Sequence, residues 1–143
     1  MSVPTTTAGL MLTKEALLQV YDEAQARFPH ECCGVFVKGP DGTPCVHPIT
    51  NIHADPEAHF LMDPYGLMEL CYDGNLAGVV GLFHSHCGKL PHPSTADLAL
   101  IDLTKMPHLI VSVGTPRLSL WASWLHHALT FGYLEDYPYY GGH

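Results

Sequence analysis

The sequence predicts an α/β fold, because patterns typical of helices and of strands alternate along the chain. Between residues 14 and 28, apolar side chains recur at three- and four-residue steps, as on one face of a helix. Residues 76–83 form a continuous apolar run, which is typical of a strand buried on both faces. The 143 residues contain no linker or internal repeat, which indicates one domain, residues 1–143, with a core of about residues 12–125.

The first part of the chain is predicted to form a helix followed by a β-hairpin. Thr13 is the candidate N-cap of the helix, and Pro29 ends it. A short strand is expected at residues 33–38, and the following Gly-Pro-Asp-Gly sequence, residues 39–42, is a strong turn signal. The returning strand is expected at residues 45–50.

The rest of the chain is predicted to contain two more helices and most of the sheet. Asp63 is a candidate N-cap, Pro64 suits the first position of a helix, and Asp73-Gly74-Asn75 stops it. The third helix is expected at residues 94–104. Short extended segments are expected at residues 59–62, 109–113, 118–124 and 128–134, whereas the Tyr-, Pro- and Gly-rich tail after residue 134 is not assigned.

Composition argues against several classes of partner. Six basic against fourteen acidic residues give a net charge of −8, whereas nucleic-acid binding needs clustered Lys and Arg. Five irregularly spaced cysteines, and the lack of a basic segment followed by an apolar one at the start, favour a reducing cytoplasm over secretion. No apolar stretch has the length needed to span a bilayer. We therefore expect a cytoplasmic protein that binds neither nucleic acid nor membrane.

The stretch GLFHSHCGKLPHPSTAD, residues 81–97, carries the candidate chemistry. His84 and His86 are two residues apart, so on a strand their imidazoles share one face and can bind one metal ion. Asp97 falls on the first turn of the expected third helix and can supply a third ligand. Two His, one Asp and an open fourth position for water are typical of a catalytic zinc site, where the pKa of the water falls to about 7.

This spacing resembles the signature of the JAMM (MPN+) zinc metalloproteases: His-Ser-His, seven residues, Ser, two residues, Asp. The family also has an upstream glutamate, followed shortly by glycine, at the edge of a strand, and Glu31 meets this requirement. The resemblance extends from about residue 12 to residue 113. It includes the Asn … Phe … Asp-Pro run of small bacterial and phage members, at residues 51–64. It implies a mixed, strongly curved sheet flanked by helices, with the cytidine-deaminase-like layering of the JAB/MPN fold.

The resemblance implies a role for each motif residue. His84, His86 and Asp97 would hold Zn²⁺. Glu31 would be the general base that takes a proton from the zinc-bound water and passes it to the leaving amine. The Ser94 hydroxyl would stabilise the oxyanion of the tetrahedral intermediate. The implied activity is that of a peptidase or isopeptidase acting at the Gly-Gly C-terminus of a ubiquitin-like or sulfur-carrier protein, as a monomer or homodimer.

Simpler structural interpretations exist for the same residues. Ser94 and Asp97 also have the spacing of a capping box, in which the carboxylate stabilises the start of a helix. A single glutamate such as Glu31 is usually an exposed carboxylate at a strand end. Ser85, between the two histidines, is expected to be structural, with its side chain directed away from theirs.

Three cysteines lie next to the candidate site residues in sequence. Cys87 stands where most family members have proline, directly after the second histidine, and Cys32 and Cys33 follow Glu31. One hypothesis is that Cys87 or Cys33 makes the site redox-sensitive or captures zinc in an inactive form. The simpler interpretation is that these residues are small, buried and apolar.

Three other functions stay open. Phage tail-assembly proteases share the motif, but there a cell-wall hydrolase domain usually follows, so we place sulfur-carrier processing first. A non-haem iron enzyme also uses two His and one carboxylate, although its ligands usually occur in a different order. A non-catalytic interaction scaffold is known from relatives without the metal residues, and binding of no metal would favour it.

Overall fold

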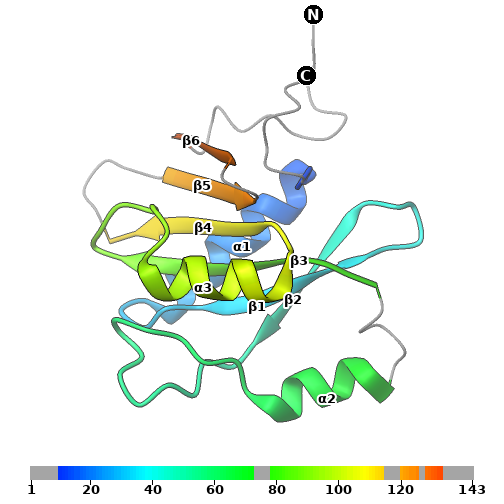
Figure 1. The fold of residues 1–143 in the computed structure, drawn as a ribbon, viewed down its shortest axis with the longest axis horizontal. Helices are drawn as coiled ribbons and strands as arrows, with labels where there is room; N and C mark the ends of the chain where they lie inside the picture. The colour runs from blue at the N-terminus through cyan, green and yellow to red at the C-terminus, as the bar shows by residue number, and fades with distance from the viewer. Residues whose placement is uncertain (1–9, 73–77, 115–119, 126–127, 134–143) are drawn as a thin grey trace, which may run out of the picture.

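A computed structural model describes residues 10–72, 78–114, 120–125 and 128–133 (Figure 1). Six strands form one sheet in the order β2-β1-β3-β4-β5-β6. Their bounds are β1 (Cys33–Lys38), β2 (Pro44–Ile49), β3 (Val79–Cys87), β4 (His108–Val113), β5 (Leu120–Leu125) and β6 (Ala128–Tyr133). Only β3 and β4 are parallel, and the other four neighbouring pairs are antiparallel. The predicted α/β class, with a mixed sheet and flanking helices, is confirmed.

In the described part of the chain, the sheet is flanked by the three helices α1 (Lys14–Arg27), α2 (Pro64–Tyr72) and α3 (Thr95–Thr104). Thr13 caps α1 as predicted, since its hydroxyl oxygen accepts a hydrogen bond from the Ala16 amide at 3.1 Å. In Figure 1, α3 lies in front of the sheet and α1 behind it. None of the helices in the described part of the chain is long and apolar enough to cross a membrane.

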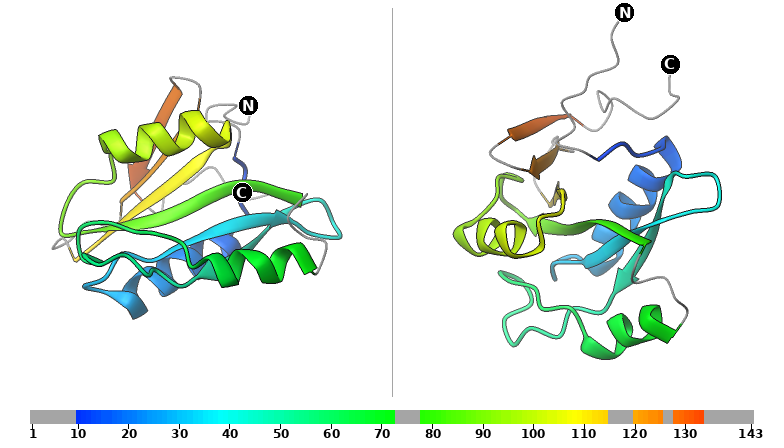
Figure 2. Two further views of the ribbon diagram at one scale, coloured as in Figure 1. Left: turned by 60° about the horizontal axis from the view of Figure 1, so that its bottom comes forward. Right: turned by 45° about the vertical axis from the view of Figure 1, so that its right-hand side comes forward.

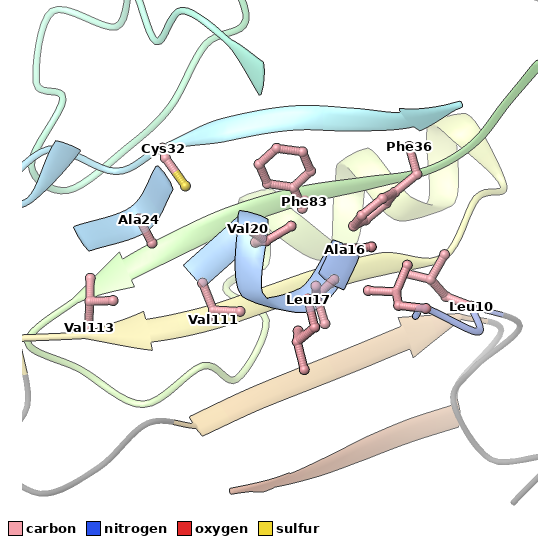
Figure 3. Close-up of a cluster of buried hydrophobic side chains, with 12 residues drawn as sticks. Leu10, Ala16, Leu17, Val20, Ala24, Cys32, Phe36, Phe83, Val111 and Val113 are labelled. Carbon is pink, nitrogen blue, oxygen red and sulfur yellow. The ribbon is translucent and has the colours of Figure 1, made fainter. Parts of the chain in front are cut away.

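The two faces of the sheet bury two separate groups of apolar side chains. Because side chains alternate along a strand, Val35 and Phe36 of β1 point to opposite faces. One group packs beneath α1 (Figure 3) and includes Leu17, Val20, Phe36, Phe83, Leu109 and Val111. The other group includes Val35, Val37, Ile49, Leu70 and Leu82, with Leu67 of α2 packed against it. The two cores hold β1 and β3 rigidly from both sides.

The position of β3 differs from the predicted strand at residues 76–83. Residues 76 and 77 lie outside the described part of the chain, and β3 runs from Val79 to Cys87. It continues beyond the apolar run because it is paired with β1 on one side and, as far as Cys87, with β4 on the other. His84 and His86 therefore lie within the centre of the sheet and not after its end.

The remaining elements agree with the prediction to within a few residues. The returning strand of the hairpin is Pro44–Ile49, and the extended segment at 59–62 contributes one isolated bridge, between Asn51 and Met62. The strands expected at 109–113, 118–124 and 128–134 correspond to β4, β5 and β6. Residues 118, 119 and 134 and the tail lie outside the described residues.

Candidate active site

Three potential metal ligands meet in a buried cluster on the α3 side of the sheet. His84, His86 and Asp97 have 0%, 4% and 5% of their surface exposed. The Nε2 atom of His84 lies 3.3 Å from Asp97 Oδ1, and the Nε2 atom of His86 lies 3.2 Å from Asp97 Oδ2. One ligand atom from each residue lies within 4.8 Å of the others, so all three can converge on one ion.

The chemistry of these atoms fits a metal ion. Nε2 of His84 is buried and has no hydrogen-bond partner among the described residues, although it faces Asp97. Buried polar nitrogens are normally paired, and an ion between the three side chains would satisfy this one. Burial lowers the pKa of His84 and outweighs the opposite effect of Asp97. The imidazole is therefore neutral at neutral pH, which is the form that binds a metal.

Asp97 also stabilises the start of α3. Its Oδ2 accepts a hydrogen bond from the Ser94 amide at 2.9 Å, and the Ser94 hydroxyl oxygen accepts one from the Asp97 amide at 3.1 Å. This is a complete capping box, so the structural interpretation of the Ser94 and Asp97 spacing is confirmed. Burial raises the pKa of Asp97, but its contacts with His84 and His86 outweigh burial and hold this pKa well below its usual range. The carboxylate is thus fixed and ionised.

Glu31 is brought to the same place by the pairing of β1 with β3. Only 2% of its surface is exposed, so the interpretation as an exposed carboxylate at a strand end is wrong. Its Oε2 lies 3.6 Å from the Lys89 ammonium and has no hydrogen-bond partner among the described residues. Burial raises the pKa of Glu31, and the opposing charges of His86 and Lys89 only partly offset this. A carboxyl group with a raised pKa is suited to accept a proton and release it again.

A cavity of about 540 Å³ opens at this cluster. Its polar end is lined by Glu31, His86, Lys89, Ser94 and Asp97. The rest is largely apolar and is lined by side chains that include Ala58, Phe60, Leu61, Met62, Leu67, Leu82, Ala96 and Leu100. Figure 2 shows the chain between β2 and α2 on the same side of the sheet as α3. Residues of both segments line the cavity. The cavity therefore combines an ionisable end with an apolar groove.

Ser94 lines the cavity and is exposed, which leaves it accessible to a substrate. Its oxygen accepts the backbone hydrogen bond of the capping box, and a hydroxyl that accepts in this way keeps its own hydrogen for donation. All five residues predicted from the motif are thus brought together: Glu31, His84, His86, Ser94 and Asp97.

Sequence reasoning missed the residues that hold the histidines. His86 Nδ1 lies 2.8 Å from the carbonyl oxygen of Leu90, and His84 Nδ1 lies 2.8 Å from Nε2 of His108. The ring of Phe60 stacks on His84 with centroids 4.4 Å apart. The contacts of His84 with His108 and Phe60 have no local sequence signal, because they depend on how distant segments pair. Leu90 is only four residues from His86, but it contributes a backbone carbonyl group, which its side chain does not signal.

Asn51 is a second residue whose role was missed, although it begins the run singled out at residues 51–64. Its side-chain amide donates hydrogen bonds to the carbonyl oxygens of Glu31 at 2.9 Å and His59 at 3.0 Å. Its side-chain oxygen accepts from the amides of His53 and Leu61, both at 3.0 Å. One side chain thus ties the cavity wall to the backbone of Glu31.

Ser85 and two of the cysteines face away from the cluster. The Ser85 hydroxyl accepts a hydrogen bond from the Cys32 amide at 2.8 Å on the α1 side, as expected of a structural serine. Cys32 belongs to the α1 core and Cys87 packs against it, so Cys87 is not placed to capture a metal ion held by the cluster. Alternation along β3 places Cys87 on the face opposite His86.

Cys33 lies on the same face as the histidines, directly opposite His84 in the β1–β3 register. Its thiol donates a hydrogen bond to the Ile49 carbonyl oxygen at 3.3 Å. Burial, with smaller contributions from Cys32 and Glu31, raises the pKa of Cys33 to about 12. The thiol therefore stays protonated at neutral pH, which is not the form that reacts with oxidants or metals.

The family described as prokaryotic homologs of the JAB domain matches residues 13–125. The chain belongs to this family. The JAMM resemblance noted in the sequence is thereby confirmed. This JAB homologue is 36% identical over 91 residues to Tail tip assembly protein K of Escherichia phage N15, which corresponds to 62% of this chain and 35% of that protein. It is 33% identical over 73 residues to Desampylase of Haloferax volcanii, covering 48% of this chain and 52% of that protein.

A solved structure of a protein from Desulfitobacterium hafniense has the same fold as this JAB homologue. The TM-score is 0.67 and the sequence identity 26%, with 87% of this chain and 90% of that one covered. The chain spans only about a third of the length of the phage protein and about half of the length of the desampylase. The similarity therefore covers the JAB domain and not the whole of either relative.

Proposed function

We propose that this protein is a zinc-dependent peptidase or isopeptidase. The observation that carries the proposal is the buried cluster of His84, His86 and Asp97, which lies at the same cavity as Glu31. Within this cluster, Nε2 of His84 has no hydrogen-bond partner among the described residues. Two imidazoles and one carboxylate are the donor set of catalytic zinc sites, which keep one position open for water. Bound zinc would supply a nucleophilic water at neutral pH and polarise the carbonyl of the scissile bond.

The protein's own residues would perform the remaining tasks. Glu31 would take the proton of the attacking water and give it to the leaving amine, since its raised pKa allows it to bind and release a proton. The Ser94 hydroxyl would donate a hydrogen bond to the carbonyl oxygen as that oxygen gains negative charge. Lys89, which faces Glu31, would keep this carboxyl group ionised before each cycle.

The substrate that we propose is the Gly-Gly C-terminal tail of a ubiquitin-like or sulfur-carrier protein. The similarity to a desampylase supports a protein substrate of this kind. An extended tail would lie along the apolar groove, with its last carbonyl at the polar end.

The first experiment measures metal content and activity together. Elemental analysis of the purified protein is expected to find about one zinc per chain, and His84→Ala should lose it, whereas His30→Ala at an exposed position should retain it. A sulfur-carrier protein with a C-terminal extension after Gly-Gly should be cleaved by wild type and not by Glu31→Gln. The exposed Glu15→Gln is the matched control. Iron in place of zinc would favour the non-haem enzyme, and no metal would favour the scaffold.

The second candidate is a phage tail-assembly protease, which the similarity to Tail tip assembly protein K favours. This candidate predicts cleavage of a tail structural protein and no cleavage of Gly-Gly extensions. Mass spectrometry of the products from both substrates, incubated with the same zinc-loaded enzyme, distinguishes the two candidates.

A further inference from the structure

His108 is a fully buried histidine for which the proposed reaction has no use. It begins β4 and lies opposite Leu82 in the parallel β3–β4 register, on the same face of the sheet as His84. Its Nε2 lies 2.8 Å from Nδ1 of His84, and the two rings meet edge to face with centroids 4.8 Å apart. His108 is not among the residues that line the cavity.

The hydrogen bond between these rings couples the position of the proton on His84 to that on His108. When two neutral imidazoles share a hydrogen bond, one nitrogen donates and the other accepts. Nε2 of His84 is the atom directed at Asp97 and at the other potential ligands. It can offer a lone pair to a metal only if the hydrogen of its ring is on Nδ1. Nδ1 must then donate to Nε2 of His108, and His108 must carry its own hydrogen on Nδ1.

The contact between His84 and His108 differs from the contact made by the other histidine of the cluster, His86. Nδ1 of His86 faces the carbonyl oxygen of Leu90, which can only accept, so this ring has a single tautomer. The partner of His84 can either donate or accept. The stacked ring of Phe60 covers one face of His84 and holds the plane of the imidazole, but it does not choose between the tautomers. The tautomer of His84 is therefore coupled to that of His108, whose Nδ1 has no hydrogen-bond partner among the described residues.

We propose that His108 is a positioning residue, which holds His84 in the tautomer and orientation that present Nε2 to the metal. The inference rests on the metal site proposed above and adds to it a residue that the JAMM motif does not contain. Partners of metal-bound histidines raise the metal affinity by fixing the ring, and their loss typically weakens binding by roughly 10- to 100-fold.

Two variants of His108 distinguish the effect of its hydrogen-bond acceptor from the effect of its size. In His108→Gln, the amide oxygen can reach about the place of Nε2 and accept from His84. His108→Leu is of similar size and cannot accept. Zinc affinity, measured by competition with a chromogenic chelator, is expected to fall roughly 10- to 100-fold in His108→Leu and only a few-fold in His108→Gln. Equal affinities of His108→Leu and wild type would overturn the proposal.

A measurement on the unmodified protein complements the variants if His108→Leu does not fold. Long-range ¹H–¹⁵N NMR spectra of the zinc-loaded wild type should show His84 protonated at Nδ1 and His108 unprotonated at Nε2. A hydrogen on Nε2 of His108 would overturn the proposal and leave the metal site standing. If the wild type binds no zinc, both the proposed function and this inference fail.

Discussion

Replacing Asn51 by alanine is expected to destabilise the protein and to slow its reaction, because one side chain ties the cavity wall to Glu31. The amide makes four hydrogen bonds of 2.9–3.0 Å, of which those to Glu31 and His53 are partly buried and those to His59 and Leu61 exposed. Each contributes a net of roughly 0.5–1.5 kcal/mol. Water can replace the exposed pair, so we expect a loss of about 2–3 kcal/mol in the free energy of unfolding, near the lower end of the sum.

Urea denaturation measures this loss. With a slope typical of small proteins, a change of this size shifts the midpoint by about 1–2 M. Activity should fall roughly 10- to 100-fold, because the backbone of Glu31 loses its anchor and a small displacement of a catalytic group is costly. The exposed neighbour Thr50→Ala is the control and should leave both quantities unchanged. If Asn51→Ala lowers the free energy of unfolding by less than about 0.5 kcal/mol, the cavity wall does not depend on the hydrogen bonds of Asn51.

Three further predictions concern the metal, the base and the close contact of β1 with β3. Zinc at 100 times its dissociation constant should stabilise wild type by about 2.7 kcal/mol, which raises the thermal midpoint by roughly 5–10 °C. A chelator should reverse this rise. The midpoint of His84→Ala should change with neither zinc nor chelator. In the metal-free protein, the pKa of Glu31 is raised, so the free energy of unfolding falls as the pH rises from the ordinary pKa of a glutamate to this raised pKa. Glu31→Gln should therefore unfold at a higher temperature than wild type at neutral pH, although it loses activity. An equal or lower thermal midpoint would contradict this prediction. Gly34→Ala should lower the free energy of unfolding, measured in urea, by more than about 2 kcal/mol. The reason is that a Cβ at this position would collide with the His47 carbonyl oxygen and the Phe83 ring.

The sequence was sufficient to predict that the three potential ligands lie together, because each is positioned by a local pattern. His84 and His86 share a face by the two-residue period of a strand, and the capping box that fixes Asp97 spans a single helical turn. The end of β3 was predicted too early, since two polar histidines interrupt an apolar run. The strand continues through them because its hydrogen bonds come from β1 and β4, which the local pattern does not contain.

The position of Glu31 was inferred from the family and not from the residues, because only the β1–β3 register brings it to the cluster. His108 and Phe60 were missed for a related reason. His108 reaches His84 through a parallel pairing, and parallel strands are joined by a crossover, here through α3. A histidine at the start of an apolar strand carries no signal of its partner, so no inspection of residues 106–110 alone would have identified it.

Contacts within the protein hold each side chain of the cluster. Asp97 is held by the cap of α3, His86 by a backbone carbonyl group and His84 by His108 and Phe60. None of these contacts requires an ion, so little of the metal-binding free energy is spent on ordering side chains. The same contacts show that the structural and functional interpretations of Ser94 and Asp97 are compatible with each other. The capping box that starts α3 is also what aims the carboxylate at the two imidazoles, so the helix and the metal site depend on the same pair of residues.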